Sequence, residues 1–282
     1  MRNNEAAPAR TPAVPLTLDG ASVMHQMFRV RRPAWRALSA ETRASLLGQA
    51  SALMLEMENR PRGQSAFYSL LGHKGDLLCL HFRENFAELH EAELCLQALP
   101  LFDYLEPASS FLSVVELGLY ESTTRVYGKL AEQGIEPYSE EWNREVESVL
   151  LRQREAMKTR LWPEIPTARY LCFYPMDRKR GEEKNWYQVP MAERQRMMHE
   201  HGLVGRRYGD QVRQIITGAI GFDDWEWGVD LFADDPLVFK RLIYEMRFDE
   251  VSAVYALFGT FYLGLRIRAE DLGAVLKGKL PA

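Results

Sequence analysis

Residues 65–82 read SAFYSLLGHKGDLLCLHF and predict a β-hairpin. Two extended runs, Ser65–Leu71 and Asp76–Phe82, are rich in aromatic and aliphatic side chains. The residues His73-Lys74-Gly75 lie between them, and a short connection that contains glycine is typical of a hairpin turn. The elements on either side of this hairpin decide the fold of the first half of the chain.

Helices flank the hairpin, and strands flank the helices. Hydrophobic periodicity predicts helices over Ala40–Asn59, with Ser39 as the N-cap, and over Asn85–Leu99. Strands are expected at Val23–Arg31 and Ser110–Tyr120. The predicted order is β-α-β-β-α-β, which is the split ferredoxin-like arrangement.

The same order returns in the second half of the chain. Strands are predicted at Arg169–Tyr174, Gln214–Gly221, Trp225–Phe232 and Val254–Leu265, and helices at Pro190–Glu200, ended by Gly202, and at Pro236–Met246, begun by Asp234 or Asp235. Two successive units predict an α+β fold with a duplicated ferredoxin-like domain. Two such antiparallel sheets can close into a barrel, the dimeric α+β barrel, and so remove their edges.

These elements divide the chain into four segments. Residues 1–19 are expected to be a disordered N-terminal tail, because they are rich in proline and alanine and lack the apolar stretch of a secretory signal. Residues 20–120 form the first unit and residues 166–282 the second. Residues 121–165 are a helical connector, in which Tyr138–Met157 is charged and helical.

The composition excludes several classes of protein. With 282 residues, 46% of them hydrophobic, the chain can bury one large core or two medium ones. No apolar run is long enough for a transmembrane segment, and the net charge of −4 gives no sign of nucleic-acid binding. The three cysteines (Cys79, Cys95, Cys172) form no C-x-x-C pair, which argues against a disulfide framework and fits a cytoplasmic protein.

The histidine pair at His199-Glu200-His201 does not match the metal motif HExxH. Residues two apart point to different sides of a helix, so both cannot easily bind one ion. One of them can act alone as the axial ligand of a haem iron. His201 precedes Gly202 at the predicted helix end, where an imidazole can project into a cavity. His25 and His81, on strands, are expected to be structural.

A basic loop follows a tyrosine in Tyr174-Pro175-Met176-Asp177-Arg178-Lys179-Arg180. Two interpretations stay open: a strand end with a solvated loop, or a site for a ligand with several negative charges. The second rests on the charge-assisted hydrogen bonds that arginine and lysine donate to carboxylates. Trp186, Trp225 and Trp227 add aromatic mass that suits a core or the walls of a porphyrin site.

In this order, these pieces resemble the chlorite dismutase-like superfamily and, within it, the coproheme decarboxylases. The matching motifs are Tyr170–Arg180 (YLCFYPMDRKR), Asn185-Trp186-Tyr187, His199–Arg206 (HEHGLVGR), Gln214–Gly228 (QIITGAIGFDDWEWG), Glu245–Ser252 (EMRFDEVS) and, in the first half, Phe111–Tyr120 (FLSVVELGLY). The second half is matched almost continuously, whereas the segment 121–162 is longer than the family pattern.

The resemblance implies a role for each matching residue. His201 is the proximal ligand of the haem iron, and Tyr174 is the catalytic tyrosine that becomes a radical. Gln214 lies on the distal side, where chlorite-degrading relatives carry an arginine. Besides Tyr174 and Gln214, the implied substrate-binding residues are Tyr120, Arg160, Met176, Arg178, Lys179, Trp186, Trp227, Arg247 and Ser252. The family's lysine four positions after the tyrosine is Arg178 here, so Arg178 or its neighbour Lys179 takes its place.

The implied activity is a step of haem biosynthesis. Hydrogen peroxide drives the oxidative decarboxylation of two propionates of iron-coproporphyrin III (coproheme) to vinyl groups, which gives haem b. The resemblance also implies a homopentamer and a transient contact with a ferrochelatase. Two alternatives remain: a haem b peroxidase or chlorite dismutase on the same fold, or a non-catalytic haem-binding protein. The neutral Gln214 argues against chlorite degradation, because it stabilises an anionic oxygen less well than a charged arginine does.

Overall fold

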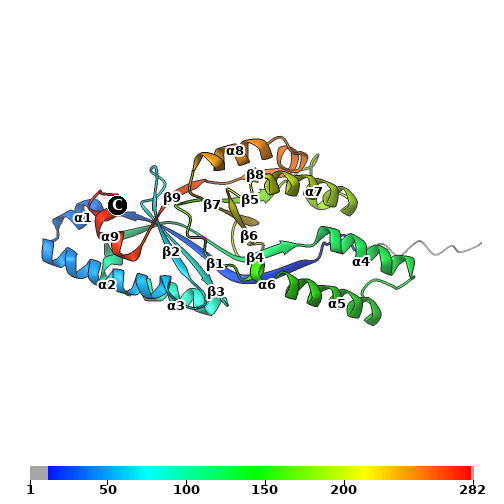
Figure 1. Cartoon of the computed structure of the whole chain (residues 1–282), viewed down its shortest axis with the longest axis horizontal. Helices are drawn as coiled ribbons and strands as arrows, with labels where there is room; N and C mark the ends of the chain where they lie inside the picture. Colours follow the sequence, from blue (N-terminus) through cyan, green and yellow to red (C-terminus); the bar gives the residue numbers. More distant parts are fainter. Residues whose placement is uncertain (1–11, 281–282) are drawn as a thin grey trace, which may run out of the picture.

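The computed structural model describes residues 12–280, and the strands of this part of the chain form one antiparallel sheet (Figure 1). The strands are β1 (Thr17–Val30), β2 (Ser65–Leu70), β3 (Leu77–Arg83), β4 (Leu105–Gly118), β5 (Tyr170–Arg178), β6 (Arg213–Gly218), β7 (Trp227–Ala233), β8 (Ala256–Phe258) and β9 (Tyr262–Ile267). Their order is β7-β6-β4-β1-β3-β2-β9-β5-β8, and β7 also pairs with β5. The sheet therefore closes on itself as a barrel.

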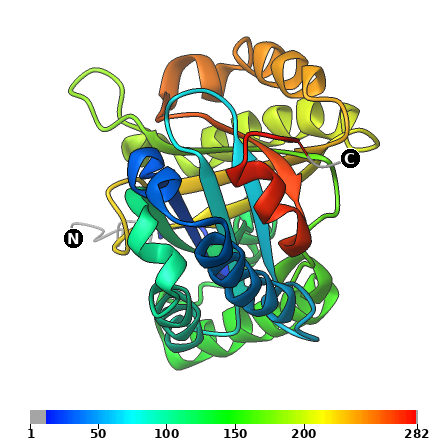
Figure 2. The same ribbon diagram turned by 90° about the vertical axis from the view of Figure 1, so that its left-hand side faces the viewer.

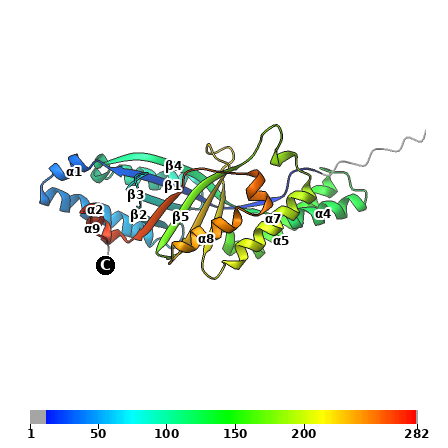
Figure 3. The same cartoon turned by 90° about the horizontal axis from the view of Figure 1, so that it is seen from above.

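The helices lie on the outside of this sheet (Figures 1 and 3). They are α1 (Arg32–Ala37), α2 (Ala40–Glu58), α3 (Phe86–Gln97), α4 (Tyr120–Glu132), α5 (Glu140–Ala156), α6 (Lys158–Leu161), α7 (Met191–Arg207), α8 (Leu237–Met246) and α9 (Leu272–Leu276). Helix α9 packs against α2 at the end that faces the viewer in Figure 2. Helices α7 and α8 cover the second half of the sheet, and the pair α4 and α5 lies at the far end. None of the helices in residues 12–280 is long and apolar enough to cross a membrane.

Both halves of the chain place their strands in the same order. The first half reads β4-β1-β3-β2 and the second reads β6-β7-β5-β9, so in each half the first and third strands are central. Short polar side chains begin the helices of the first half: Ser39 Oγ accepts from the Thr42 amide at 3.1 Å, and Asn85 Oδ1 accepts from the Glu88 amide at 2.9 Å. The predicted mixed α+β fold with an antiparallel sheet is confirmed.

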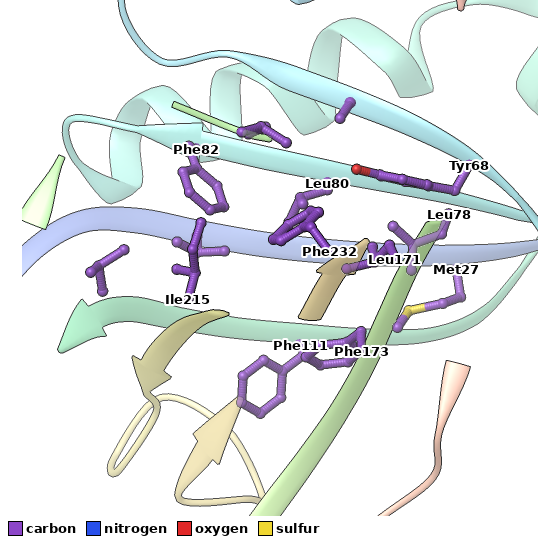
Figure 4. Close-up of a cluster of buried hydrophobic side chains, with 14 of the residues drawn as sticks. Met27, Tyr68, Leu78, Leu80, Phe82, Phe111, Leu171, Phe173, Ile215 and Phe232 are labelled. Carbon is purple, nitrogen blue, oxygen red and sulfur yellow. The ribbon is translucent and has the colours of Figure 1, made fainter. Parts of the chain in front are cut away.

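The interior of the barrel holds a core to which both halves contribute (Figure 4). Leu80 and Phe111 come from the first half, and Phe173 and Phe232 come from the second. Because successive side chains of a strand point to opposite faces, Phe173 inside the barrel places its neighbour Tyr174 outside it. The second half of the sheet thus offers an outer face to α7 and α8.

Gly228 is a position where the barrel interior has no room for a side chain. A Cβ atom there would lie 2.5 Å from Phe111 Cε1 and 2.7 Å from Thr217 Oγ1. We expect Gly228→Ala to lower the free energy of unfolding by about 1–3 kcal/mol, the usual cost of overpacking a core. Urea unfolding measures this change. The control is Gly48→Ala on α2, where a Cβ meets nothing within 4 Å and where we expect a gain of about 0.5–1 kcal/mol. A Gly228→Ala midpoint equal to that of the parent would contradict the expectation.

Two predicted boundaries in the second half are wrong. Helix α7 does not end at Gly202 but continues to Arg207. A single glycine inside a helix costs only about 1 kcal/mol, and the packing of α7 against α4 and α8 outweighs that cost. His201 therefore lies within the helix. The predicted strand Val254–Leu265 is interrupted: a π-helical turn at Val251–Tyr255 leads into the short strand β8, and β9 begins at Tyr262.

The break between β8 and β9 coincides with a one-residue change of register against β5, because Met176 pairs with Phe258 whereas Phe173 pairs with Tyr262. Gly259 passes so close to β5 that a Cβ atom there would lie 2.8 Å from Pro175 Cγ. At the other end of the chain, β1 begins at Thr17, inside the segment assigned to the tail, and Leu18 is fully buried. Residues 1–11 of that segment lie outside the described residues.

Candidate functional site

Four of the predicted site residues share the outer face of the second half of the sheet. Tyr174 pairs with Val229 and Met176 pairs with Trp227, while Gln214 pairs with Leu231. Paired residues of antiparallel strands lie on the same face, and the intervening Phe173 faces the barrel interior. Tyr174, Met176, Gln214 and Trp227 therefore all face α7 and α8.

Tyr174 is buried on this face, with 5% of its surface exposed. Its ring stacks on Phe261, with the ring centroids 4.4 Å apart, and lies 5.8 Å from the ring of Phe258. Burial raises the pKa of the Tyr174 phenol above its ordinary value, and the positive charges of Arg247 and Arg178 oppose that rise. The phenol thus keeps its proton at neutral pH and lies near two guanidinium groups.

His201 on α7 is oriented by a carboxylate that the sequence reasoning did not select. His201 Nδ1 lies 2.9 Å from Asp249 Oδ2 and 3.4 Å from Ser252 Oγ. The Ser252 amide donates to Asp249 Oδ1 at 2.8 Å. Burial raises the pKa of Asp249, but the hydrogen bonds from His201 and Ser252 outweigh it and leave that pKa below its ordinary value. The ionised carboxylate accepts the Nδ1 proton, which leaves Nε2 free to bind a metal.

Arg178 is the last residue of β5. It lies on the same face as Tyr174, because the two residues are four apart along the strand. It is 9% exposed, and its Cζ lies 5.0 Å from the Trp186 ring. Its Nη2 lies 3.6 Å from Met198 Sδ, the guanidinium's one hydrogen-bond acceptor within residues 12–280. Burial lowers the pKa of Arg178. The Arg178 amide donates to Glu226 Oε2 at 2.8 Å, which fixes the strand end.

Lys179 is the first residue after β5. Its amide donates to the carbonyl of Tyr255, the residue just before β8, at 2.7 Å. A hollow of about 560 Å³ adjoins this loop and is lined by Asp177, Arg178, Lys179, Arg180, Gly181, Glu183, Lys184 and Leu257. Tyr174 does not line it. Of Arg178 and Lys179, Arg178 is the residue whose charge acts on the Tyr174 phenol.

The remaining predicted residues divide into two groups. Arg247, whose Cζ lies 3.6 Å from the centroid of Phe258, and Tyr120, whose ring lies 6.5 Å from Trp186, join the site. Arg160 does not: it is exposed on α6, which packs against β1 and β4. No contact within the described residues connects Arg160 to Tyr174 or His201.

The structure also adds residues that were not predicted. Trp227 Nε1 donates to Glu116 Oε1 at 3.3 Å, and burial raises the pKa of the Glu116 carboxyl. Gly205 on α7 passes close to Gln214, because a Cβ at Gly205 would lie 3.4 Å from Gln214 Nε2. Asp249 belongs to the matching motif Glu245–Ser252. It lies 48 residues from His201 in the sequence, so no local pattern predicts their contact.

Comparison with known proteins gives one family. The family model described as chlorite dismutase matches residues 43–267. A solved structure of a haem-binding protein from Thermus thermophilus is 38% identical, with 94% of this chain and 98% of that chain covered and a TM-score of 0.80. The chlorite dismutase of Candidatus Nitrospira defluvii in complex with imidazole is 17% identical, with 92% and 95% covered and a TM-score of 0.67, which shows a shared fold.

Proposed function

The chain belongs to the chlorite dismutase family, and we propose that within this family it is a coproheme decarboxylase. It would use hydrogen peroxide to convert two propionates of iron-coproporphyrin III to vinyl groups. The observation that carries the proposal is the position of the Tyr174 phenol, buried beside the charges of Arg178 and Arg247. It lies on the sheet face that meets the helix of His201.

The residues of the site fit an iron porphyrin better than a bare metal ion. Within residues 12–280, no group of three or more histidine, cysteine, aspartate or glutamate residues could hold a metal. His201 offers a single free nitrogen, so the other ligands must come from a macrocycle. Arg178 is a buried cation whose guanidinium, among the residues that the structure describes, donates only to a thioether, and a propionate would satisfy it. The description of the 38% identical relative as a haem-binding protein supports the same ligand.

In the proposed reaction, the bound iron porphyrin supplies an oxidising equivalent when peroxide reacts with it. Tyr174 gives up one electron and its phenolic proton, and the resulting tyrosyl radical takes a hydrogen atom from the β-carbon of a propionate. The substrate radical then loses carbon dioxide and a second electron, which the oxidised iron porphyrin would accept, and the vinyl group remains. Each propionate thus consumes one hydrogen peroxide and one proton and yields one carbon dioxide and two waters. The rings of Phe258 and Phe261 exclude water from the radical.

Four further residues have supporting roles in this proposal. Asp249 holds His201 in the tautomer that leaves Nε2 free. Arg178 and Arg247 bind and orient propionates beside Tyr174. Gln214 is neutral, and charge-assisted hydrogen bonds are about twice as strong as neutral ones, so Gln214 supports decarboxylation rather than chlorite degradation. For Lys179 and Arg160, a role in propionate binding remains a prediction.

The test is a titration of the protein with ferric coproheme and hydrogen peroxide. We expect product masses that fall by one carbon dioxide and two hydrogens per propionate, ending at haem b. Absence of any vinyl product would overturn the proposal. Rapid oxygen release from chlorite by the haem b complex would instead indicate a chlorite dismutase. Tight coproheme binding without a peroxide-dependent product would indicate a haem-binding protein.

The assembly belongs to the same proposal. We propose that the two halves are duplicated ferredoxin-like units in a dimeric α+β barrel, and that five copies form a ring in the cytoplasm. A transient contact with a ferrochelatase would deliver coproheme. Light scattering of the purified protein measures the number of copies, and a mass other than that of a pentamer would contradict the ring.

A further inference from the structure

A second buried guanidinium lies on α7 at Arg194, seven residues before His201. Arg194 is 3% exposed, and its Nη2 donates to the Ala13 carbonyl. Its Nε has no hydrogen-bond partner within residues 12–280, and no carboxylate in that part of the chain forms an ion pair with it. Burying a cation without a counter-ion is unfavourable, so an anion is needed to complete this position.

Arg194 and Arg178 both lie near one methionine, Met198. Met198 Sδ contacts Arg178 Nη2, and residues 194 and 198 are neighbours on the surface of α7 because they are four apart. Both positive charges also reach Tyr120 at the start of α4, where they oppose the rise in the Tyr120 pKa that burial causes. Two guanidinium groups and a phenol therefore converge where α4 meets α7.

The chain segment before β1 holds Arg194 in place. The Leu16 amide donates to Thr123 Oγ1 at 2.9 Å, and the Leu119 amide donates to the Leu16 carbonyl at 2.8 Å. These bonds fix residues 13–16 against α4, so that the Ala13 carbonyl binds one Nη of Arg194. A guanidinium has five donors in a rigid plane, and the donors that remain can bind both oxygens of a carboxylate.

We propose that Arg194 and Arg178 together bind one carboxylate of the tetrapyrrole, between α4 and α7, with residues 13–16 positioning Arg194. The inference rests on the porphyrin ligand proposed above and adds a residue to it. Apolar walls from Trp186 and Met197, which pack in one cluster with Tyr120 and Met198, suit the two methylenes of a propionate and the edge of the macrocycle.

The experiment measures the binding of metal-free coproporphyrin III, which carries the carboxylates but cannot react with peroxide. We expect Arg194→Gln to raise the dissociation constant about tenfold to a hundredfold, as loss of a hydrogen bond to a charged group does. Glutamine keeps one donor for the Ala13 carbonyl. Arg194→Lys keeps the charge without the planar fork and should give an intermediate value. Arg206→Gln removes the same charge from an exposed position of the same helix and should bind like the parent.

Thermal unfolding without ligand separates this role from a structural one. If Arg194 serves the ligand, removing its uncompensated charge should leave the melting temperature of the free protein unchanged or raised. A lowered melting temperature with unchanged coproporphyrin binding would overturn the proposal, as would unchanged binding alone. If Arg194→Gln binds coproporphyrin and decarboxylates coproheme like the parent, Arg194 does not bind the carboxylate, but the proposed function stands. If Arg194→Gln weakens binding and the parent does not decarboxylate coproheme, the carboxylate site stands, but the proposed function is wrong. A parent that binds no coproporphyrin would overturn both.

Discussion

Tyr174→Phe is expected to bind coproheme like the parent and to lose decarboxylation by about 10²–10⁴-fold, the range over which a single positioned reacting side chain acts. Phenylalanine keeps the ring that stacks on Phe261 but has no hydroxyl hydrogen to surrender. The packing of the β5 face should therefore survive while the relay of the oxidising equivalent is lost. Product masses after the peroxide titration measure the rate, and the porphyrin absorption band measures binding.

A matched control keeps this result specific. Tyr244→Phe makes the same change on the exposed surface of α8 and should leave the rate unchanged. Turnover by Tyr174→Phe at the parental rate would remove Tyr174 from the mechanism. Loss of binding by the same variant would mean that the hydroxyl binds the substrate. The low rate would then reflect weak binding and would not support a tyrosyl radical.

His201→Ala is expected to remove the axial ligand and to change the spin state of the bound ferric iron. Because Asp249 orients the imidazole, Asp249→Asn should act in the same direction and more weakly, with an affinity for iron porphyrin that falls about tenfold to a hundredfold. Absorption and electron paramagnetic resonance spectra measure both effects. An unchanged axial spectrum for His201→Ala would place the ligand elsewhere.

The pH dependence of this pair has a definite sign. The folded-state pKa of Asp249 lies below its ordinary value. The stabilisation from its ionised form is therefore present at neutral pH and is lost as the pH falls through that depressed pKa. In Asp249→Asn, this part of the acid sensitivity should disappear from the axial spectrum.

Much of the fold followed from local signals. The two apolar runs around the turn at Gly75 indicated the hairpin, and Ser39 and Asn85 marked two helix starts that the structure confirms. The errors occur where tertiary contacts override a local rule. Gly202 looked like a helix end, but packing carries α7 through it. The run after residue 254 looked like one strand, but an extra residue between Phe258 and Tyr262 shifts its register against β5 and interrupts it.

The sequence alone determined the order of the elements and the candidate residues on Tyr174–Arg180 and at His201. A hydrophobic period fixes which face of a strand or helix is buried, yet it does not say what packs on that face. Only the tertiary structure joined β5 to β7 and β9, gave His201 its carboxylate partner, and brought Arg178 against Met198, one helical turn from Arg194. These contacts join residues from different elements of the chain. They form because the closed sheet places α4, α7 and the turn after α8 around one face.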